Sequence, residues 1–153
     1  MKKTIILFFV SVLAYTMDAQ NPINYYQHLP NGYKLKDSNN ELGPFVEEDF
    51  DKDGINDLAI ILFTSKDATP VFGYFLSSKF TTTKTFKFFE WTFMMHEMSY
   101  ENGIISLSSN NGSMPIYGSM NLKYDAVKKD IKVTKYEDSS GGKSANFKTI
   151  TVN

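Results

Sequence analysis

The sequence predicts a mainly β fold, built as one compact antiparallel domain. Short stretches rich in β-branched and aromatic residues recur roughly every 8–12 residues, a spacing typical of sandwiches and barrels. Asn-Gly pairs at 102–103 and 111–112 are turn signals of β-hairpins. Aromatic residues make up 15% of the chain, which supplies the bulky side chains that a small β core requires. A sandwich, a meander and a barrel-like sheet all agree with this pattern.

Turn-forming and polar segments divide the chain into nine expected strands. We place them at residues 33–36, 44–48, 57–64, 71–77, 84–96, 103–109, 116–124, 131–137 and 147–152. Strand 57–64 has the strongest signal, because the run Leu-Ala-Ile-Ile-Leu-Phe is apolar and rich in β-branched residues. Strand 84–96 is the longest, and its aromatic and Met residues fall on both faces. A short helix is also expected within residues 22–29.

The most informative stretch is the acidic loop, residues 49–57, which reads Asp-Phe-Asp-Lys-Asp-Gly-Ile-Asn-Asp. Its carboxylates stand at loop positions 1, 3, 5 and 9, and a glycine stands at position 6. This spacing wraps oxygen ligands around Ca²⁺, and position 7 then contributes its backbone carbonyl. The loop therefore predicts a Ca²⁺ site made by Asp49, Asp51, Asp53, the Ile55 carbonyl and Asp57. The alternative is a solvated acidic turn without an ion.

The residues around the acidic loop narrow the kind of calcium site. An EF-hand requires a carboxylate at position 12 and a helix on each side of the loop. Position 12 is Ile60, inside the expected strand 57–64, so an EF-hand does not fit. A full propeller does not fit either, because the sequence contains one acidic loop and no internal repeat. We expect a calcium loop between two strands of a single domain.

The acidic loop resembles the Asp-x-Asp-x-Asp-Gly-x-x-Asp loops of FG-GAP and VCBS modules. In those modules the loop joins two strands, and an Asp-Leu-Ala-Ile type strand follows, as it does at residues 57–60. The resemblance implies that Asp49, Asp51, Asp53 and Asp57 give side-chain ligands and that Ile55 gives a carbonyl ligand.

Residues 29–35, Leu-Pro-Asn-Gly-Tyr-Lys-Leu, extend this resemblance to small secreted bacterial proteins that carry one such loop. The match covers about residues 29–64. It departs from the usual pattern at Glu48, where a glycine is expected, and at Asp51, where Asn is usual. The resemblance implies a metal site and an exported location, and it implies no activity.

The N-terminus has the features of a secretory signal peptide. Lys2 and Lys3 form a basic start, residues 5–13 are mostly apolar, and a cut after Ala19 or Gln20 would suit a signal peptidase. The apolar run is short of the roughly 20 residues that span a bilayer, although a retained anchor is the alternative. We therefore expect a signal peptide at residues 1–19, a single mainly β domain at residues 20–153, and a secreted or periplasmic location.

Composition excludes several classes of function. The chain contains no Cys, so it has no disulfide, no thiolate metal site and no lipobox cysteine for a lipid anchor. All of its 16 basic residues are Lys, and they are spread among 17 acidic residues. Because nucleic-acid recognition relies on Arg and on basic stripes, we expect no nucleic-acid partner. After signal removal we expect no membrane partner and a monomer.

Other residues suggest weaker hypotheses. Met94, His96 and Met98 would share one strand face, and thioether with imidazole suits Cu(I), although methionines beside aromatic residues more often fill core gaps. Glu47 and Glu48 are adjacent carboxylates that would point to opposite faces of a strand, which argues against a paired catalytic role. Tyr25 and Tyr26 form the aromatic pair that we would test as a surface platform.

Two hypotheses of function follow. The first is a secreted or periplasmic, non-catalytic module in which Ca²⁺ stabilises a strand–loop–strand element, for interaction with an extracellular protein or glycan. The second is a small exported enzyme or enzyme inhibitor, whose site the sequence does not reveal. A cleft with convergent polar groups away from the acidic loop would favour the second hypothesis.

Overall fold

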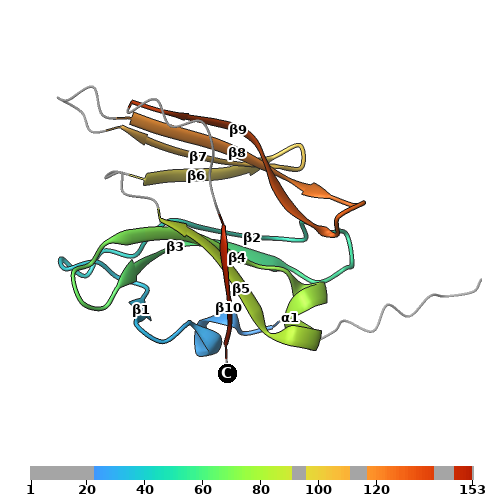
Figure 1. Ribbon diagram of the computed structural model, residues 1–153, viewed down its shortest axis with the longest axis horizontal. Coiled ribbons are helices and arrows are strands. Elements are labelled where there is room, and N and C mark those ends of the chain that lie inside the picture. The colour runs from blue at the N-terminus through green and yellow to red at the C-terminus, as the bar shows by residue number, and fades with distance from the viewer. Residues whose placement is uncertain (1–22, 91–95, 111–116, 140–146, 153) are drawn as a thin grey trace, which may run out of the picture.

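The computed structural model describes residues 23–90, 96–110, 117–139 and 147–152. Within these residues, ten strands form two antiparallel sheets, which confirms the expected mainly β fold (Figure 1). The expected signal peptide and the Asn111-Gly112 turn lie outside the described residues.

The first sheet contains six strands, among them the first and the last strand of the described chain. Its strands are β1 (Tyr33–Lys34), β2 (Phe45–Glu48), β3 (Asp57–Thr64), β4 (Pro70–Phe75), β5 (Thr85–Glu90) and β10 (Lys148–Thr151). The order is β1-β3-β4-β5-β10. β2 pairs with the first half of β3, from Glu48 opposite Asp57 to Phe45 opposite Ile60, while β1 pairs with the last two residues of β3. β3, which follows the acidic loop, therefore pairs with three strands: β1, β2 and β4.

The second sheet is a four-stranded meander. It runs in the order β6 (His96–Glu101), β7 (Ile104–Asn110), β8 (Tyr117–Asp125) and β9 (Asp130–Asp138). Asn102 and Gly103 join β6 to β7 with φ angles of 52° and 76°. Two consecutive residues with positive φ are typical of a type I′ hairpin turn, so the expected Asn-Gly turn is confirmed here.

The two sheets pack face to face as a sandwich (Figure 1). Side chains from alternate positions of β3 and β4 meet those of β7 and β8, as period-2 strand geometry requires. The buried residues between the sheets are Phe50, Ala59, Ile61, Phe63, Phe72, Tyr74, Leu76, Ile105, Leu107, Met120, Leu122 and Ile131.

The far face of the first sheet is buried as well. The 3₁₀ helix η1 (Tyr25–His28) and the helix α1 (Ser77–Thr83) cover it (Figure 1). Leu58, Ile60 and Leu62 of β3 point into this second cluster, together with Tyr25 and Phe80 from the two helices. Because both faces of β3 are covered, residues 57–63 are all buried, and this explains the continuous apolar run in the sequence.

Several expected elements need correction. Strand 57–64 agrees with β3 at both ends, but the expected strand 84–96 is wrong as one element, since β5 ends at Glu90 and β6 begins at His96 in the other sheet. The sequence of residues 84–96 has a strand-like pattern throughout, so it does not indicate where the chain leaves the first sheet. Helix α1 was not expected, because Ser and Thr dominate its sequence and favour helices poorly.

No helix among the described residues is long and apolar enough to cross a membrane.

Candidate metal centre

The acidic loop connects β2 to β3 at the edge of the first sheet. Phe50, near the start of the loop, is buried between the two sheets and packs against Tyr100 with ring centroids 5.2 Å apart. Lys52 and Gly54 adopt positive φ angles of 64° and 91°, which turn the chain sharply. Glycine suits the second of these positions because it has no Cβ to clash in this conformation. One hydrophobic anchor and two left-handed residues thus shape the loop.

Asp57 is fully buried at the first position of β3, where it joins three parts of the chain. Its Oδ2 accepts hydrogen bonds from the backbone N–H groups of Phe50 (2.7 Å) and Asp51 (3.2 Å), and its Oδ1 accepts one from the N–H of Ser77 (2.7 Å). Burial, together with the negative charge of Asp51, raises the pKa of Asp57 to about 6 despite these hydrogen bonds. The carboxyl therefore carries an electrostatic cost whenever it is ionised without a cation nearby.

Three carboxylates of the acidic loop converge. One oxygen from each of Asp49, Asp51 and Asp57 lies within 4.8 Å of the other two, so these residues could hold a metal ion. Asp49 accepts hydrogen bonds from the N–H groups of Asp53 (3.1 Å) and Gly54 (3.1 Å), which fold the loop back around it. Burial raises the pKa of Asp51, and the neighbouring carboxylates add to that effect. The donor set consists of oxygen atoms, which hard divalent cations prefer.

Asp53, a fourth predicted ligand, lies beside this group. Asp53 Oδ2 accepts a hydrogen bond from Ser77 Oγ (2.8 Å), while its Oδ1 accepts one from the N–H of Ile55 (2.9 Å). Asp53 is therefore turned toward helix α1, and the structure gathers Asp49, Asp51 and Asp57 without it. The full set of five ligands stays a prediction.

Helix α1 contributes contacts that the sequence did not suggest. The Ser78 hydroxyl donates to Asp51 Oδ2, and Ser77 contacts both Asp53 and Asp57. The N-cap residue Leu76 offers no side-chain hydrogen bond to the start of α1, and Asp57 of the acidic loop accepts the bond from the first backbone donor, the N–H of Ser77. Only the unusual Ser-Ser pair after a strand could have pointed to this role.

A polar cluster next to α1 ties the second sheet to the first. Asp130, at the start of β9, forms ion pairs with Lys79 (3.0 Å) and Lys87, and it accepts a hydrogen bond from the Tyr74 hydroxyl (3.0 Å). Burial works to raise the pKa of Asp130, but the two lysines outweigh it and lower the pKa. A small cavity of about 350 Å³ lies between this cluster and the acidic loop, lined by Asp51, Asp53, Ser78, Lys79, Tyr124 and Lys129.

The other hypotheses from the sequence have mixed outcomes. Tyr25 is not part of a surface platform, because it is buried, stacks on Phe75 and donates its hydroxyl to the Asn56 carbonyl (2.7 Å). Met98 packs against the core between the sheets, while Met94 of the copper hypothesis lies outside the described residues. Glu47 and Glu48 are both exposed on β2.

Comparison with protein-family models, curated proteins and solved structures gives no match for this chain. The resemblance to FG-GAP and VCBS loops therefore stays a prediction.

Proposed function

We propose that this chain is a secreted or periplasmic, non-catalytic module whose acidic loop binds Ca²⁺ and thereby stabilises the β2–loop–β3 element. The observation that carries the proposal is the convergence of Asp49, Asp51 and Asp57 at the junction with helix α1. Asp53 and the Ile55 carbonyl would complete the ligand set, as in the FG-GAP and VCBS loops that the sequence resembles.

The spacing of the carboxylates suits Ca²⁺. Calcium takes six to eight oxygen ligands at about 2.3–2.6 Å, so ligands on opposite sides of the ion lie roughly 5 Å apart. Donor oxygens within 4.8 Å of one another fit around such an ion. Mg²⁺ requires a tighter octahedron and gives up water reluctantly, so it should substitute poorly.

Electrostatics also favours an ion. Four carboxylates stand within nine residues, and burial raises the pKa of Asp51 and of Asp57, whose pKa reaches about 6. A divalent cation would offset both the repulsion and the cost of burying Asp57 in its charged form. Because Asp51 and Asp57 also contact Ser78 and Ser77, the ion would stabilise the position of α1 as well as that of the loop.

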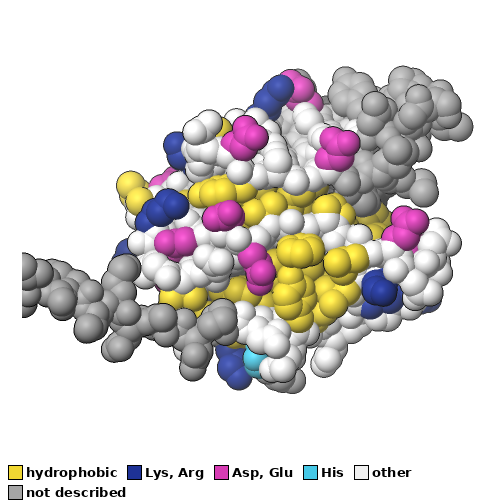
Figure 2. Space-filling view, turned by 180° about the vertical axis from the view of Figure 1, so that it is seen from behind, with side chains coloured by type: hydrophobic (Ala, Val, Ile, Leu, Met, Phe, Trp, Pro, Cys, Tyr) yellow, Lys and Arg dark blue, Asp and Glu magenta, His cyan; other side chains and the backbone are white. Residues whose placement is uncertain are grey.

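The partner in this proposal is an extracellular protein or a glycan. Figure 2 shows exposed hydrophobic surface with acidic side chains beside it. Among the described residues, Leu42 and Phe45 are large hydrophobic side chains left 50% and 43% exposed, and Tyr26 packs edge-to-face on Phe45. Exposed hydrophobic surface of this kind is typical of interaction sites.

Isothermal titration with CaCl₂ tests the metal site. The parent protein should bind one Ca²⁺ with micromolar to millimolar affinity, the range of extracellular loop sites. Asp49→Asn and Asp51→Asn should each weaken binding at least tenfold, because each removes a charged ligand. Glu137→Gln, the same charge change on an exposed residue of β9, is the matched control and should bind like the parent. Unchanged affinity in both loop variants would refute the assignment.

The second candidate, a small exported enzyme or enzyme inhibitor, is favoured by a separate groove between the two sheets. Hydrogen bonds from Thr64 and Thr69 lower the pKa of Asp67 in this groove to about 2, which does not suit a general acid at neutral pH. Turnover of chromogenic ester or glycoside substrates that Ser109→Ala abolishes would establish an enzyme. Absence of turnover would favour the binding module.

A further inference from the structure

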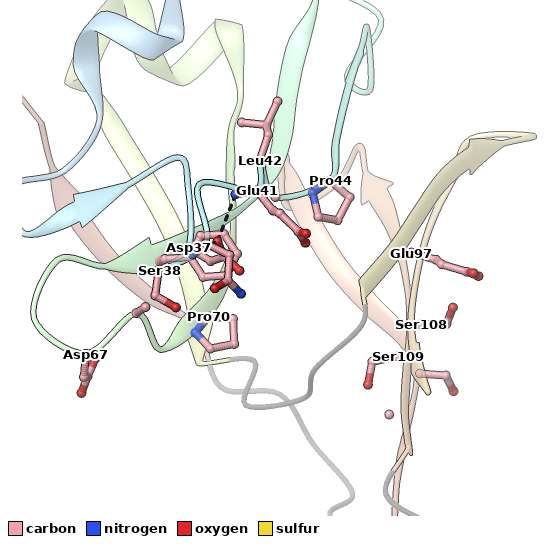
Figure 3. Close-up of a pocket in the computed structure, with 16 residues that line it drawn as sticks. Asp37, Ser38, Glu41, Leu42, Pro44, Asp67, Pro70, Glu97, Ser108 and Ser109 are labelled. Carbon is pink, nitrogen blue, oxygen red and sulfur yellow. Dashed lines mark hydrogen bonds between the residues drawn. The ribbon is translucent and has the colours of Figure 1, made fainter. Parts of the chain in front are cut away.

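A groove of about 1100 Å³ opens between the two sheets, at the end of β3 remote from the acidic loop (Figure 3). Asp57 begins β3 in the acidic loop, whereas Phe63, near the other end of the strand, lines the groove. Phe63 is six residues after Asp57, which corresponds to about 20 Å along an extended strand. The groove is therefore a distinct feature, and none of the proposed calcium ligands lines it.

Ser109 of β7 is a buried polar side chain that points into this groove. It is 4% exposed, and its Oγ is the one buried side-chain oxygen or nitrogen without a hydrogen-bond partner among the described residues. Ser109 follows Ile105 and Leu107 on the inner face of β7, and Figure 3 shows it on the side facing Pro70 and Asp37. An apolar residue would suit packing alone, because an unpaired buried hydroxyl is unfavourable. The presence of serine at position 109 therefore indicates a ligand that hydrogen-bonds to the serine hydroxyl.

The charge of the groove indicates the kind of ligand. Four carboxylates line it, from Asp37, Glu41, Asp67 and Glu97, and no lysine is among its described lining residues. Asp37 Oδ1 accepts hydrogen bonds from the N–H groups of Asn39 (2.7 Å) and Glu41 (3.0 Å), which fixes the turn that carries Glu41. In Figure 3 the Glu41 side chain leans toward the second sheet. The groove therefore presents negative charge to whatever enters it.

A single metal ion does not explain this arrangement. Among the described residues, the acidic loop supplies the group of three carboxylates close enough to share an ion, and the carboxylates of the groove form no such group. Charges spread over a groove of this volume match an extended organic cation better than a point charge. The volume is slightly above the roughly 300–1,000 Å³ typical of small-molecule pockets, so an extended ligand fits.

We propose that this groove binds an organic cation, in which a primary ammonium or guanidinium group donates a hydrogen bond to Ser109 Oγ while the carboxylates that line the groove, Glu41 among them, attract its positive charge. Such groups carry several donors and no acceptor, which complements a hydroxyl oxygen flanked by carboxylates. The cation can belong to a small polyamine or to a Lys or Arg side chain of a peptide.

Titration of the purified protein with two probes, 1,5-diaminopentane and the peptide Gly-Lys-Gly, tests the proposal. Glucose and Gly-Gln-Gly are the neutral controls, and each titration is run in EDTA and in Ca²⁺ so that failure of the calcium site is recognised separately. We expect at least one cationic probe to bind at least tenfold more tightly than its neutral control. A stronger diamine indicates a small-molecule ligand, and a stronger peptide indicates a protein ligand.

Two variants locate the binding. Ser109→Ala and Glu41→Gln should each weaken binding of the cationic probe at least tenfold, whereas Glu137→Gln should leave it unchanged. Ser109→Ala should also keep or raise the Tm, because it removes an unpaired buried hydroxyl, and this shows that lost binding is not lost folding. The proposal is overturned if neither cation binds at millimolar concentration, if the neutral probes bind equally well, or if both variants bind like the parent.

Discussion

Asp57→Asn should remove the pH dependence of stability that the buried carboxyl imposes on the ion-free protein. Asp57 has no exposed surface, and burial raises its pKa from 3.8 to about 6. A carboxyl whose pKa is higher in the folded protein stabilises the fold fully below its unfolded pKa. This contribution is lost as the pH rises from about 4 through 6. Asn mimics the neutral carboxyl in shape and does not titrate.

The size of the effect follows from the two pKa values. Binding of one proton with pKa values of 3.8 in the unfolded chain and about 6 in the folded chain changes the unfolding free energy by about 2 kcal/mol between pH 4.5 and 7. In EDTA, the stability of Asp57→Asn relative to the parent should therefore rise by about 2 kcal/mol over this interval. The amide accepts the hydrogen bonds from Phe50 and Ser77 less well than the carboxylate does. This loss lowers the stability of Asp57→Asn by the same amount at every pH, so it cancels when the stability difference at pH 7 is compared with that at pH 4.5.

Urea unfolding at pH 4.5, 5.5, 6.5 and 7.5 in EDTA measures this difference, and the same series in Ca²⁺ provides the contrast. In Ca²⁺ the parent should be the more stable protein at pH 7.5, because the ion binds the carboxylate that Asn lacks. A free-energy difference in EDTA that stays constant within about 0.5 kcal/mol would show that Asp57 titrates normally, and the account of its burial would be wrong.

Three further substitutions test other parts of the structure by urea unfolding. Asp49→Ala should cost less than about 1 kcal/mol in EDTA, because the residue is only half-buried, yet it should remove most of the stabilisation by Ca²⁺; a large loss in EDTA would contradict this. Asp130→Asn should cost about 1–3 kcal/mol, since it breaks a partly buried pair with Lys87, whereas a neutral effect would show that the cluster is not stabilising. Gly73→Ala should destabilise by about 1–3 kcal/mol or more, because a Cβ at this position would overlap the Phe86 ring, and retention of parental stability would show that the ring can move.

Much of the fold could be predicted from the sequence, because local patterns determine it. The run from Leu58 to Phe63 is apolar without interruption, and it forms a strand buried on both faces. Asn102 and Gly103 can adopt positive φ with little cost, and they form the expected hairpin turn. The boundary between β5 and β6 was missed because residues on both sides of it have the same strand-like pattern, and only tertiary packing decides which sheet each half joins.

Helix α1 shows why part of the candidate site could not be predicted. Its sequence, Ser-Ser-Lys-Phe-Thr-Thr-Thr, has low helix propensity. Its first two residues, Ser77 and Ser78, instead donate hydrogen bonds to carboxylates of the acidic loop, and the helix buries Phe80. These contacts join residues 20 or more positions apart, so no short-range pattern reveals them. The orphan hydroxyl of Ser109 was invisible for the same reason, since its surroundings depend on how the two sheets pack.

The most direct test of the central claim is a thermal unfolding experiment on the purified protein at pH 7.5, in EDTA, in millimolar Ca²⁺ and in equal Mg²⁺. At 100 times the Kd, the ion adds about 2.7 kcal/mol, which corresponds to a rise in Tm of about 8 °C for a domain of this size. We predict this rise in Ca²⁺ and little change in Mg²⁺. Equal Tm values in all three solutions would show that the acidic loop is a turn held by its own hydrogen bonds and not a calcium site.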